Sequence, residues 1–174
     1  MYQRAPKLRS GIASTSGVAI PNRQPPLAHA AIDLPTTPDD GGRKAIVGSF
    51  TTTHGSLRVV SLHLSHLRTP DATRLRTTQL FFALEAAQAG WAVELVVAGD
   101  FNALWTAPEL VALRRVATAA SAPSLAGQTS LIGTTGALID HIALISPALP
   151  AASPTEIPAP TAILHFAEIA LVLD

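Results

Sequence analysis

Apolar residues in this chain gather into short runs that predict β-strands. Residues 45–53 and 57–64 are rich in β-branched side chains and flank His54-Gly55, which is typical of a hairpin turn. Glu94 to Ala98 is a compact apolar run, as expected of a buried strand. Further short runs complete the predicted strands, at residues 17–20, 138–145 and 169–173.

One stretch has both the period and the boundary residues of a helix. It follows Thr69-Pro70, a capping residue with proline at the first helical position. The predicted helix runs from about Asp71 to Ala89 and stops at Gly90, a usual C-terminal breaker. The expected apolar face holds Leu80, Leu84 and Ala87, with Phe81 beside them.

A second helix is predicted after Thr106, with Leu110, Leu113 and Val116 in register. Two stretches rich in turn residues predict loops. Residues 33–43 contain Pro, Asp and Gly, and residues 146–160 contain five prolines. Neither loop is long enough to separate two domains, so we expect residues 1–174 to form a single α/β (α+β) domain. Residues 1–16 are polar and are expected to be loose.

Composition narrows the chemistry. Apolar residues make up 48% of the chain, which is a globular composition. The chain has no cysteine, so any metal site depends on oxygen and imidazole ligands. No apolar run is long enough to cross a bilayer, and no apolar segment follows the basic start MYQRAPKLRS. We therefore expect a cytoplasmic protein without a transmembrane segment.

Charge is balanced overall but unevenly placed. Residues 1–76 carry ten Lys/Arg and four Asp/Glu, whereas residues 77–174 carry two and eight, so the parts have net charges of +6 and −6. A neutral chain gives no general case for a polyanionic partner. A basic first part that faces phosphate is one alternative, and ordinary solvated charge is the preferred interpretation.

The most informative residues are polar groups at the ends of predicted strands. His63, Asp100, Asn102, Asp140 and His165 all hold such positions. A strand end fixes a side chain rigidly, which suits a site that needs defined geometry. Taken singly, His63 and His165 are more often structural than catalytic. His29, His54 and His66 have no context that raises them above surface residues.

Asp100 and Asn102 lie two residues apart and would face the same way in an extended segment. A carboxylate with an amide oxygen suits a hard cation or a phosphate with its water. The alternative is an Asx-turn that closes the strand, which spacing alone favours by roughly two to one.

Asp140 interrupts an apolar run, and a charge there should be paired. A histidine would be held in one tautomer by such a carboxylate. His141 points to the opposite face of a strand, which leaves His165 as the candidate partner. A core aspartate bonded to backbone donors is an equally weighted alternative.

In this order the segments resemble the endonuclease/exonuclease/phosphatase superfamily from about Gly17 to the C-terminus. Residues 97–103 match the "GDFN" signature, and residues 139–142 match the "IDhI" strand. His165 falls where the closing "SDH" histidine belongs. Further likenesses are GVAIPNR at 17–23 with the "GvAIlsR" strand, and His63-Leu64 with Arg74, Arg76 and Gln79, which resemble "HL…R…Q".

The resemblance implies a four-layer α/β/β/α sandwich that hydrolyses a phosphoester with Mg²⁺. His165, oriented by Asp140, would activate water, and Asp100 would position that water and the metal. Asn102 would hold a phosphate oxygen, and His63 would contact the phosphate or the leaving group. The metal ligands implied are Asp100 and Asn102. The substrate class, among nucleic acid, phospholipid and inositol phosphate, is not resolved by sequence.

Two departures from the family pattern bear on activity. No strand that carries a metal-binding Glu is expected before Gly17, and Leu164 stands where the closing motif has Asp. We therefore expect weak or no Mg²⁺ binding and a sandwich without its first strands, with the coding region continuing upstream of Met1. The alternatives to a nuclease or phosphodiesterase are an inactive remnant and a phosphate-binding module without turnover. A complete chain is expected to be monomeric.

Overall fold

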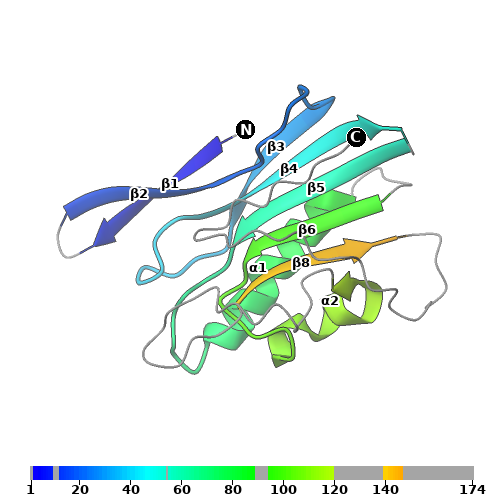
Figure 1. Ribbon diagram of the computed structural model, residues 1–174. Coiled ribbons are helices and arrows are strands. Elements are labelled where there is room, and N and C mark those ends of the chain that lie inside the picture. Colours follow the sequence, from blue (N-terminus) through cyan, green and yellow to red (C-terminus); the bar gives the residue numbers. More distant parts are fainter. Residues whose placement is uncertain (1, 10–11, 54, 89–93, 120–138, 147–174) are drawn as a thin grey trace.

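The computed structural model describes residues 2–9, 12–53, 55–88, 94–119 and 139–146 (Figure 1). Within these ranges the largest element is a mixed sheet of six strands in the order β3-β4-β5-β6-β8-β7. Its strands are β3 (Ala28–Leu34), β4 (Arg43–Thr52), β5 (Gly55–His63), β6 (Glu94–Asp100), β7 (Thr118–Ala119) and β8 (Asp140–Ile145).

Strand direction in the centre of this sheet determines where the polar residues meet. β4 and β5 form the predicted antiparallel hairpin, whereas β5 and β6 run parallel. A parallel pair needs a crossover connection, and helix α1 (Ala72–Gln88) supplies it. β8 is antiparallel to β6. The ends of β5 and β6 and the start of β8 therefore share one edge of the sheet.

Two further strands precede the sheet, so the expectation that residues 1–16 are loose is wrong. β1 (Tyr2–Arg9) and β2 (Ile12–Ala19) pair antiparallel along their whole length. Apart from the predicted strand at 17–20, their polar composition and Pro6 give no strand signal. In a two-stranded ribbon each strand keeps one open edge, where proline and polar residues are tolerated.

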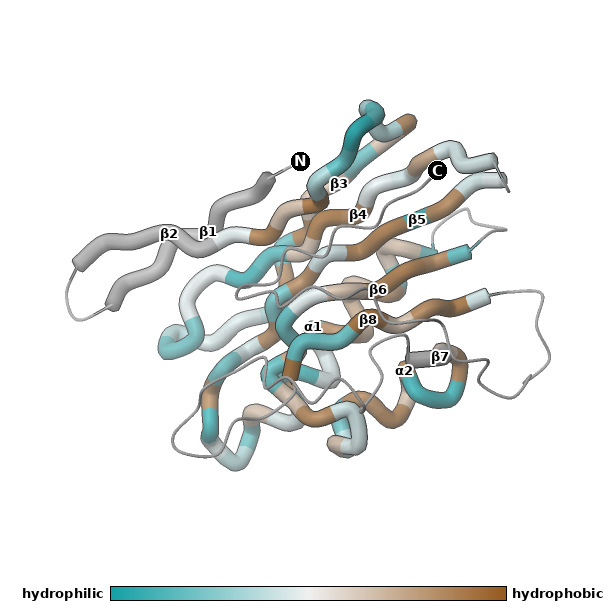
Figure 2. The backbone as a smooth tube through the Cα atoms, in the orientation of Figure 1, coloured by the Kyte–Doolittle hydropathy of each residue, from teal (hydrophilic) through white to brown (hydrophobic). Residues whose placement is uncertain are grey.

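One core lies between the sheet and the helices. Successive residues of a strand alternate between faces, and Val60, Leu62 and Val97 point toward this core. Leu80 and Ala87 of α1 pack there, as the helical period predicts. Phe81, expected beside them, is instead 60% exposed. The tube in Figure 2 shows the apolar central strands above this helical layer.

A second core lies on the opposite face of the sheet. Val18 and Ile20, at the end of β2, pack with Ile46, Phe50 and Val59. The described residues thus form a helical layer, a six-stranded sheet and a two-stranded sheet packed on its other face (Figure 1). These are three of the four layers of the expected α/β/β/α sandwich, in the expected order, and the second helical layer is not among the described residues.

The second predicted helix is present in part, and one strand of the sheet was not predicted. The second helix begins as a 3₁₀ turn, η1 (Pro108–Leu110), and continues as α2 (Val111–Val116), where Val116 is 57% exposed and not in the core. β3 was not predicted, because an edge strand with mostly exposed residues has no buried face to pattern it.

The loop at 146–160 and the strand at 169–173 lie outside the described residues, apart from Ser146. No described helix has the length and hydropathy to span a bilayer.

Candidate functional site

Three of the predicted residues form a row across adjacent strands. His63 is the register partner of Asp100 across β5 and β6, and Asp100 is the partner of Asp140 across β6 and β8. Partners on neighbouring strands have their side chains about 5 Å apart at Cβ. Sequence reasoning placed Asp140 inside a strand, but it is the first residue of β8. The structure therefore brings together groups that are far apart in sequence.

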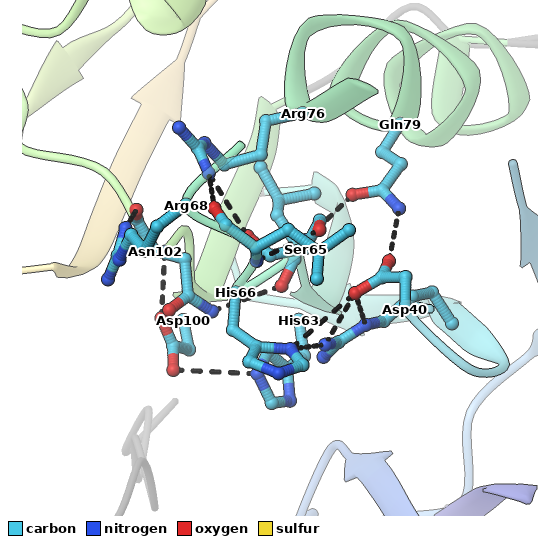
Figure 3. A network of polar contacts seen from close by, with 12 residues as sticks. Asp40, His63, Ser65, His66, Arg68, Arg76, Gln79, Asp100 and Asn102 are labelled. Carbon is cyan, nitrogen blue, oxygen red and sulfur yellow. Dashed lines mark hydrogen bonds and ion pairs between the residues drawn. The ribbon is translucent and has the colours of Figure 1, made fainter. Parts of the chain in front are cut away.

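His63 and Asp100 contact each other directly in this row. The distance from His63 Nε2 to Asp100 Oδ2 is 3.6 Å, and each side chain is 30% exposed (Figure 3). An imidazole and a carboxylate at this distance attract when the imidazole is protonated. Both groups reach solvent, so a ligand can approach them.

The turn after β6 holds Asp100 in place. Gly99 has φ 140°, and a Cβ there would lie 2.0 Å from the Leu62 carbonyl oxygen. Only glycine therefore lets β6 approach β5 this closely. The Asn102 backbone N–H donates to Asp100 Oδ1 at 2.8 Å. The Asx-turn favoured from spacing is present, and it fixes one carboxylate oxygen.

Asn102 itself is buried and locked. It adopts φ 50°, and its Nδ2 donates to the Leu64 carbonyl at 3.0 Å. Arg68 Nη1 donates to the Asn102 carbonyl at 3.1 Å. Because the two ends of an amide point in different directions, Oδ1 of Asn102 is the end that points away from Leu64. The turn thus joins β6 to the loop after β5.

Burial raises the pKa of Asp100 to about 6, since desolvation penalises its charged form. The Asn102 N–H lowers this pKa, the neighbouring Asp140 raises it, and the Arg43 and Arg68 charges lower it. A carboxyl group that titrates near neutral pH is suited to proton transfer or to replacement of its proton by a cation.

His141 points to the opposite face of the sheet from Asp140, as strand alternation predicts. This is the face on which the helices pack. It is 1% exposed, and its ring lies against Phe101 and Trp105. Its Nε2 donates to the Ala103 carbonyl at 2.8 Å. Burial lowers the pKa of His141, against the opposing effects of that carbonyl and of Asp140. The neutral His141 ring therefore stabilises the turn after β6 through its hydrogen bond to the Ala103 carbonyl.

A buried polar network lies beside the row (Figure 3). The Gln79 side chain accepts from the Ser65 N–H at 2.8 Å and donates to the Pro35 carbonyl at 2.7 Å. It also donates to Asp40 Oδ2 at 3.3 Å. Arg43 donates to Asp40 Oδ1 through Nε at 3.2 Å and Nη2 at 2.9 Å. One glutamine thus ties the loop before β4 to the loop after β5.

A buried ion pair fixes the other side of the loop after β5. Arg76 Nη2 and Glu109 Oε1 are 2.7 Å apart, and both side chains are almost fully buried. Arg76 Nη1 donates to the carbonyls of Ser65 at 3.3 Å and Leu67 at 3.1 Å. The arginine and glutamine of the "HL…R…Q" resemblance are therefore structural ties on α1.

No sequence-family profile and no curated protein matches the chain. Solved structures do match it. An endonuclease/exonuclease/phosphatase of Bacteroides vulgatus is 17% identical with a TM-score of 0.57, and the match covers 84% of this chain and 65% of that one. The chain has the endonuclease/exonuclease/phosphatase fold.

Two further structures share this fold. The human Nocturnin catalytic domain, with a bound sulfate anion, is 22% identical with a TM-score of 0.55, covering 84% of this chain and 60% of that one. TDP2 of D. rerio, complexed with a single-strand DNA product, is 16% identical with a TM-score of 0.57, covering 87% and 64%. The chain spans less than two thirds of the length of each of the three structures.

Several residues of this endonuclease/exonuclease/phosphatase fold were missed by sequence reasoning. The sequence pattern places Asp40 and Arg43 only in the predicted loop at 33–43. His66 was treated as a surface residue, yet its Nδ1 contacts Arg43 Nη2 and lies 3.5 Å from Asp40 Oδ1. These contacts join segments that are distant in sequence, so no local sequence pattern predicts them. The only hint was H-x-x-H spacing between His63 and His66. Of the other sequence candidates, His29 is exposed on β3, and His54 and His165 lie outside the described residues.

The donor chemistry near Asp100 suits a hard cation only in part. Asp100 and Asp140 are like charges on neighbouring strands, a pairing that a divalent cation would relieve. Within the described ranges, however, no three His, Asp or Glu side chains cluster closely enough to hold a metal ion. Mg²⁺ prefers six oxygen ligands and usually keeps several waters. Asp100 and Asn102 would thus supply only part of its coordination shell.

Proposed function

We propose that the chain is a phosphoester hydrolase by ancestry, of the nuclease or phosphodiesterase type. The observation that carries this proposal is the row of His63, Asp100 and Asp140 at one edge of the sheet. The fold supports it, since one structure with this fold is described as complexed with a DNA product. Another is described with a bound sulfate, an anion of the shape of phosphate.

In the proposed hydrolysis each residue of the site would have a separate role. His63, which contacts Asp100 and solvent, would donate a proton or hydrogen bond to a phosphoryl or leaving-group oxygen. Asn102, locked by its own hydrogen bonds, would present its Oδ1 or its backbone to the substrate or its metal. Asp140 and the sequence-predicted His165 would hold and activate the attacking water. In-line attack needs such fixed placement.

Mg²⁺ would be held by Asp100 and Asn102, with Asp140 close by, and the remaining positions would be filled by water or substrate oxygens. When bound, the ion would neutralise charge on the phosphoryl oxygens. Asp100 must be ionised to bind it, and its pKa of about 6 places that change just below neutral pH. Leu164, which replaces the expected Asp, leaves the shell one carboxylate short.

Leu164 and the few described oxygen ligands favour a second candidate function, which is phosphate binding without turnover. The two functions differ in whether a bond is broken. The retained row of His63, Asp100 and Asp140 favours hydrolysis.

Hydrolysis of bis(p-nitrophenyl) phosphate with 10 mM Mg²⁺ at about pH 7.5 tests the proposal. We expect slow turnover, and His63→Ala should reduce kcat/KM about 100-fold, the usual contribution of a positioned acid or base. His29→Ala, an exposed histidine on β3, is the matched control and should leave the rate unchanged. Turnover that is equal in the two variants, or absent from the unmodified chain, would reject the hydrolase proposal.

A further inference from the structure

His66 lies in the loop after β5, three residues beyond His63 (Figure 3). Its side chain is 46% exposed, so it borders solvent as His63 does. Arg43 Nη2 contacts its Nδ1, and Asp40 Oδ1 lies 3.5 Å from the same atom. The Gln79 amide in turn holds Asp40 from the other side. His66 is thus positioned by two buried side chains, Arg43 and Asp40, the second of which is held by Gln79.

The contact with Arg43 determines which nitrogen of His66 carries the proton. A guanidinium group is always protonated and can only donate, so His66 Nδ1 must accept. In the neutral ring the proton then resides on Nε2. Because the two nitrogens lie on different edges of the ring, Nε2 points away from Arg43. His66 therefore presents an N–H donor without needing a positive charge.

The charged groups behind His66 are a buried ion pair, Arg43 with Asp40, and a second arginine, Arg68. Arg43 is 4% exposed, and Asp40 neutralises it through Nε and Nη2 only. In the part of the chain that the structure describes, Arg43 Nη1 is buried without a hydrogen-bond partner. Arg68, on the same loop as His66, adds a second cation that acts on Asp100. Both arginines attract an anion beside His66, and the Asp40 carboxylate behind the ring is held in its pair with Arg43.

We propose that His66, oriented by Arg43, forms a second anion-binding position beside His63, where its Nε2–H donates to a phosphate oxygen of the substrate. The inference deepens the proposed function and rests on it for the identity of the substrate. Binding at His66 does not require a metal, because the donor is a neutral N–H and Arg68 on the same loop supplies a positive charge. The carboxylates of Asp100 and Asp140, in contrast, repel an anion unless a cation lies between them.

Two substitutions separate the role of Nε2 from that of Nδ1. His66→Gln places an amide nitrogen near the position of Nε2, whereas His66→Asn reaches only as far as Nδ1. The probe is inorganic phosphate, titrated with EDTA at about pH 7.5 into the unmodified chain and into both variants, while the backbone amide resonances of the loop after β5 are followed by NMR. We expect a saturable shift with a Kd of about 1–10 mM, typical of a few charge-assisted hydrogen bonds.

The glutamine variant should keep this affinity within about threefold, and the asparagine variant should lose about tenfold, the value of one such bond. Amide spectra of both variants check that they are folded. No saturable shift up to 50 mM phosphate, or equal losses in the two variants, would overturn the inference. The proposed function is tested separately, since hydrolysis needs Mg²⁺ and His63. An inactive chain that binds phosphate through His66 would refute hydrolysis alone.

Discussion

Asp100 and Asp140 face each other in register across β6 and β8, so two carboxyl groups share one edge of the sheet. Only one of them is required to hold a proton to remove the repulsion. The proton resides on Asp100 up to about pH 6, because burial raises its pKa and Asp140 adds to that effect. This arrangement makes the stability of the protein depend on pH.

Unfolding in urea should show this dependence in buffer that contains EDTA. The folded state keeps the Asp100 proton up to about pH 6, whereas the unfolded state loses it near its ordinary value of 3.8. The free energy of unfolding therefore falls as pH rises between these values. Asp100→Asn removes the penalty and should be more stable than the unmodified chain at pH 7.5, by up to about 3 kcal/mol. A less stable variant at pH 7.5 would contradict this prediction.

Asp140→Asn should lower the pKa of Asp100, because it removes the neighbouring negative charge. The decrease should be partial, since desolvation is the larger cause and remains in the variant. Carbon-13 NMR of the Asp100 carboxyl group, followed from pH 3 to pH 8, measures the change. A full return to the ordinary value would mean that burial is not the main cause.

Gly99→Ala should destabilise the protein severely. Its Cβ would lie 2.0 Å from the Leu62 carbonyl oxygen, and the residue has φ 140°. We expect a loss of more than about 3 kcal/mol, since backbone strain adds to the clash. Gly55→Ala is the matched control, because Gly55 has φ 127° but nothing within 4 Å of a Cβ. It should lose only about 1–2 kcal/mol by thermal or urea unfolding. Equal losses would show that the contact with β5 is unimportant.

The buried pair of Arg76 and Glu109 should be sensitive to removal of one partner. Arg76→Met leaves the Glu109 carboxylate buried without its cation and should cost about 3–5 kcal/mol. The double variant Arg76→Met/Glu109→Leu removes both charges and should recover most of that loss. Urea unfolding of the two variants compares them. A double variant no more stable than the single one would show that the arginine acts through Ser65 and Leu67 instead.

Magnesium binding should be weak in this chain and should improve when a carboxylate is restored. Calorimetric titration at neutral pH measures the affinity of the unmodified chain and of Leu164→Asp. The substitution adds an oxygen ligand of the kind that Mg²⁺ prefers, so we expect tighter binding in the variant. A tight one-to-one isotherm for the unmodified chain would show that other ligands complete the shell.

Local sequence signals predicted the centre of the fold well. The hairpin of β4 and β5, helix α1 and β6 each have a pattern that depends only on neighbouring residues. The GDFN turn is also predictable from neighbouring residues, since Gly99 and the spacing of Asp100 and Asn102 determine its shape. In contrast, β1 and β3 are edge or ribbon strands with little apolar alternation, and local patterns missed them.

The supporting network had no local signal at all. Gln79 contacts Pro35, Asp40 and Ser65, which belong to two other loops. Such contacts depend on how α1 packs on the sheet, and a single sequence does not encode that relation in any window. The contact between His66 and Arg43 is unpredictable for the same reason, because Arg43 begins another strand.

The parallel pairing of β5 with β6 has a consequence for the order in which the chain folds. The β4–β5 hairpin closes a short turn and forms from local contacts, whereas β6 joins only after α1 has crossed over. From this topology we expect β8, which carries Asp140, to join β6 after that step. The like charges of Asp100 and Asp140 would then meet near the end of folding. Their repulsion would lower the stability of the native state without slowing the earlier steps that assemble the rest of the sheet.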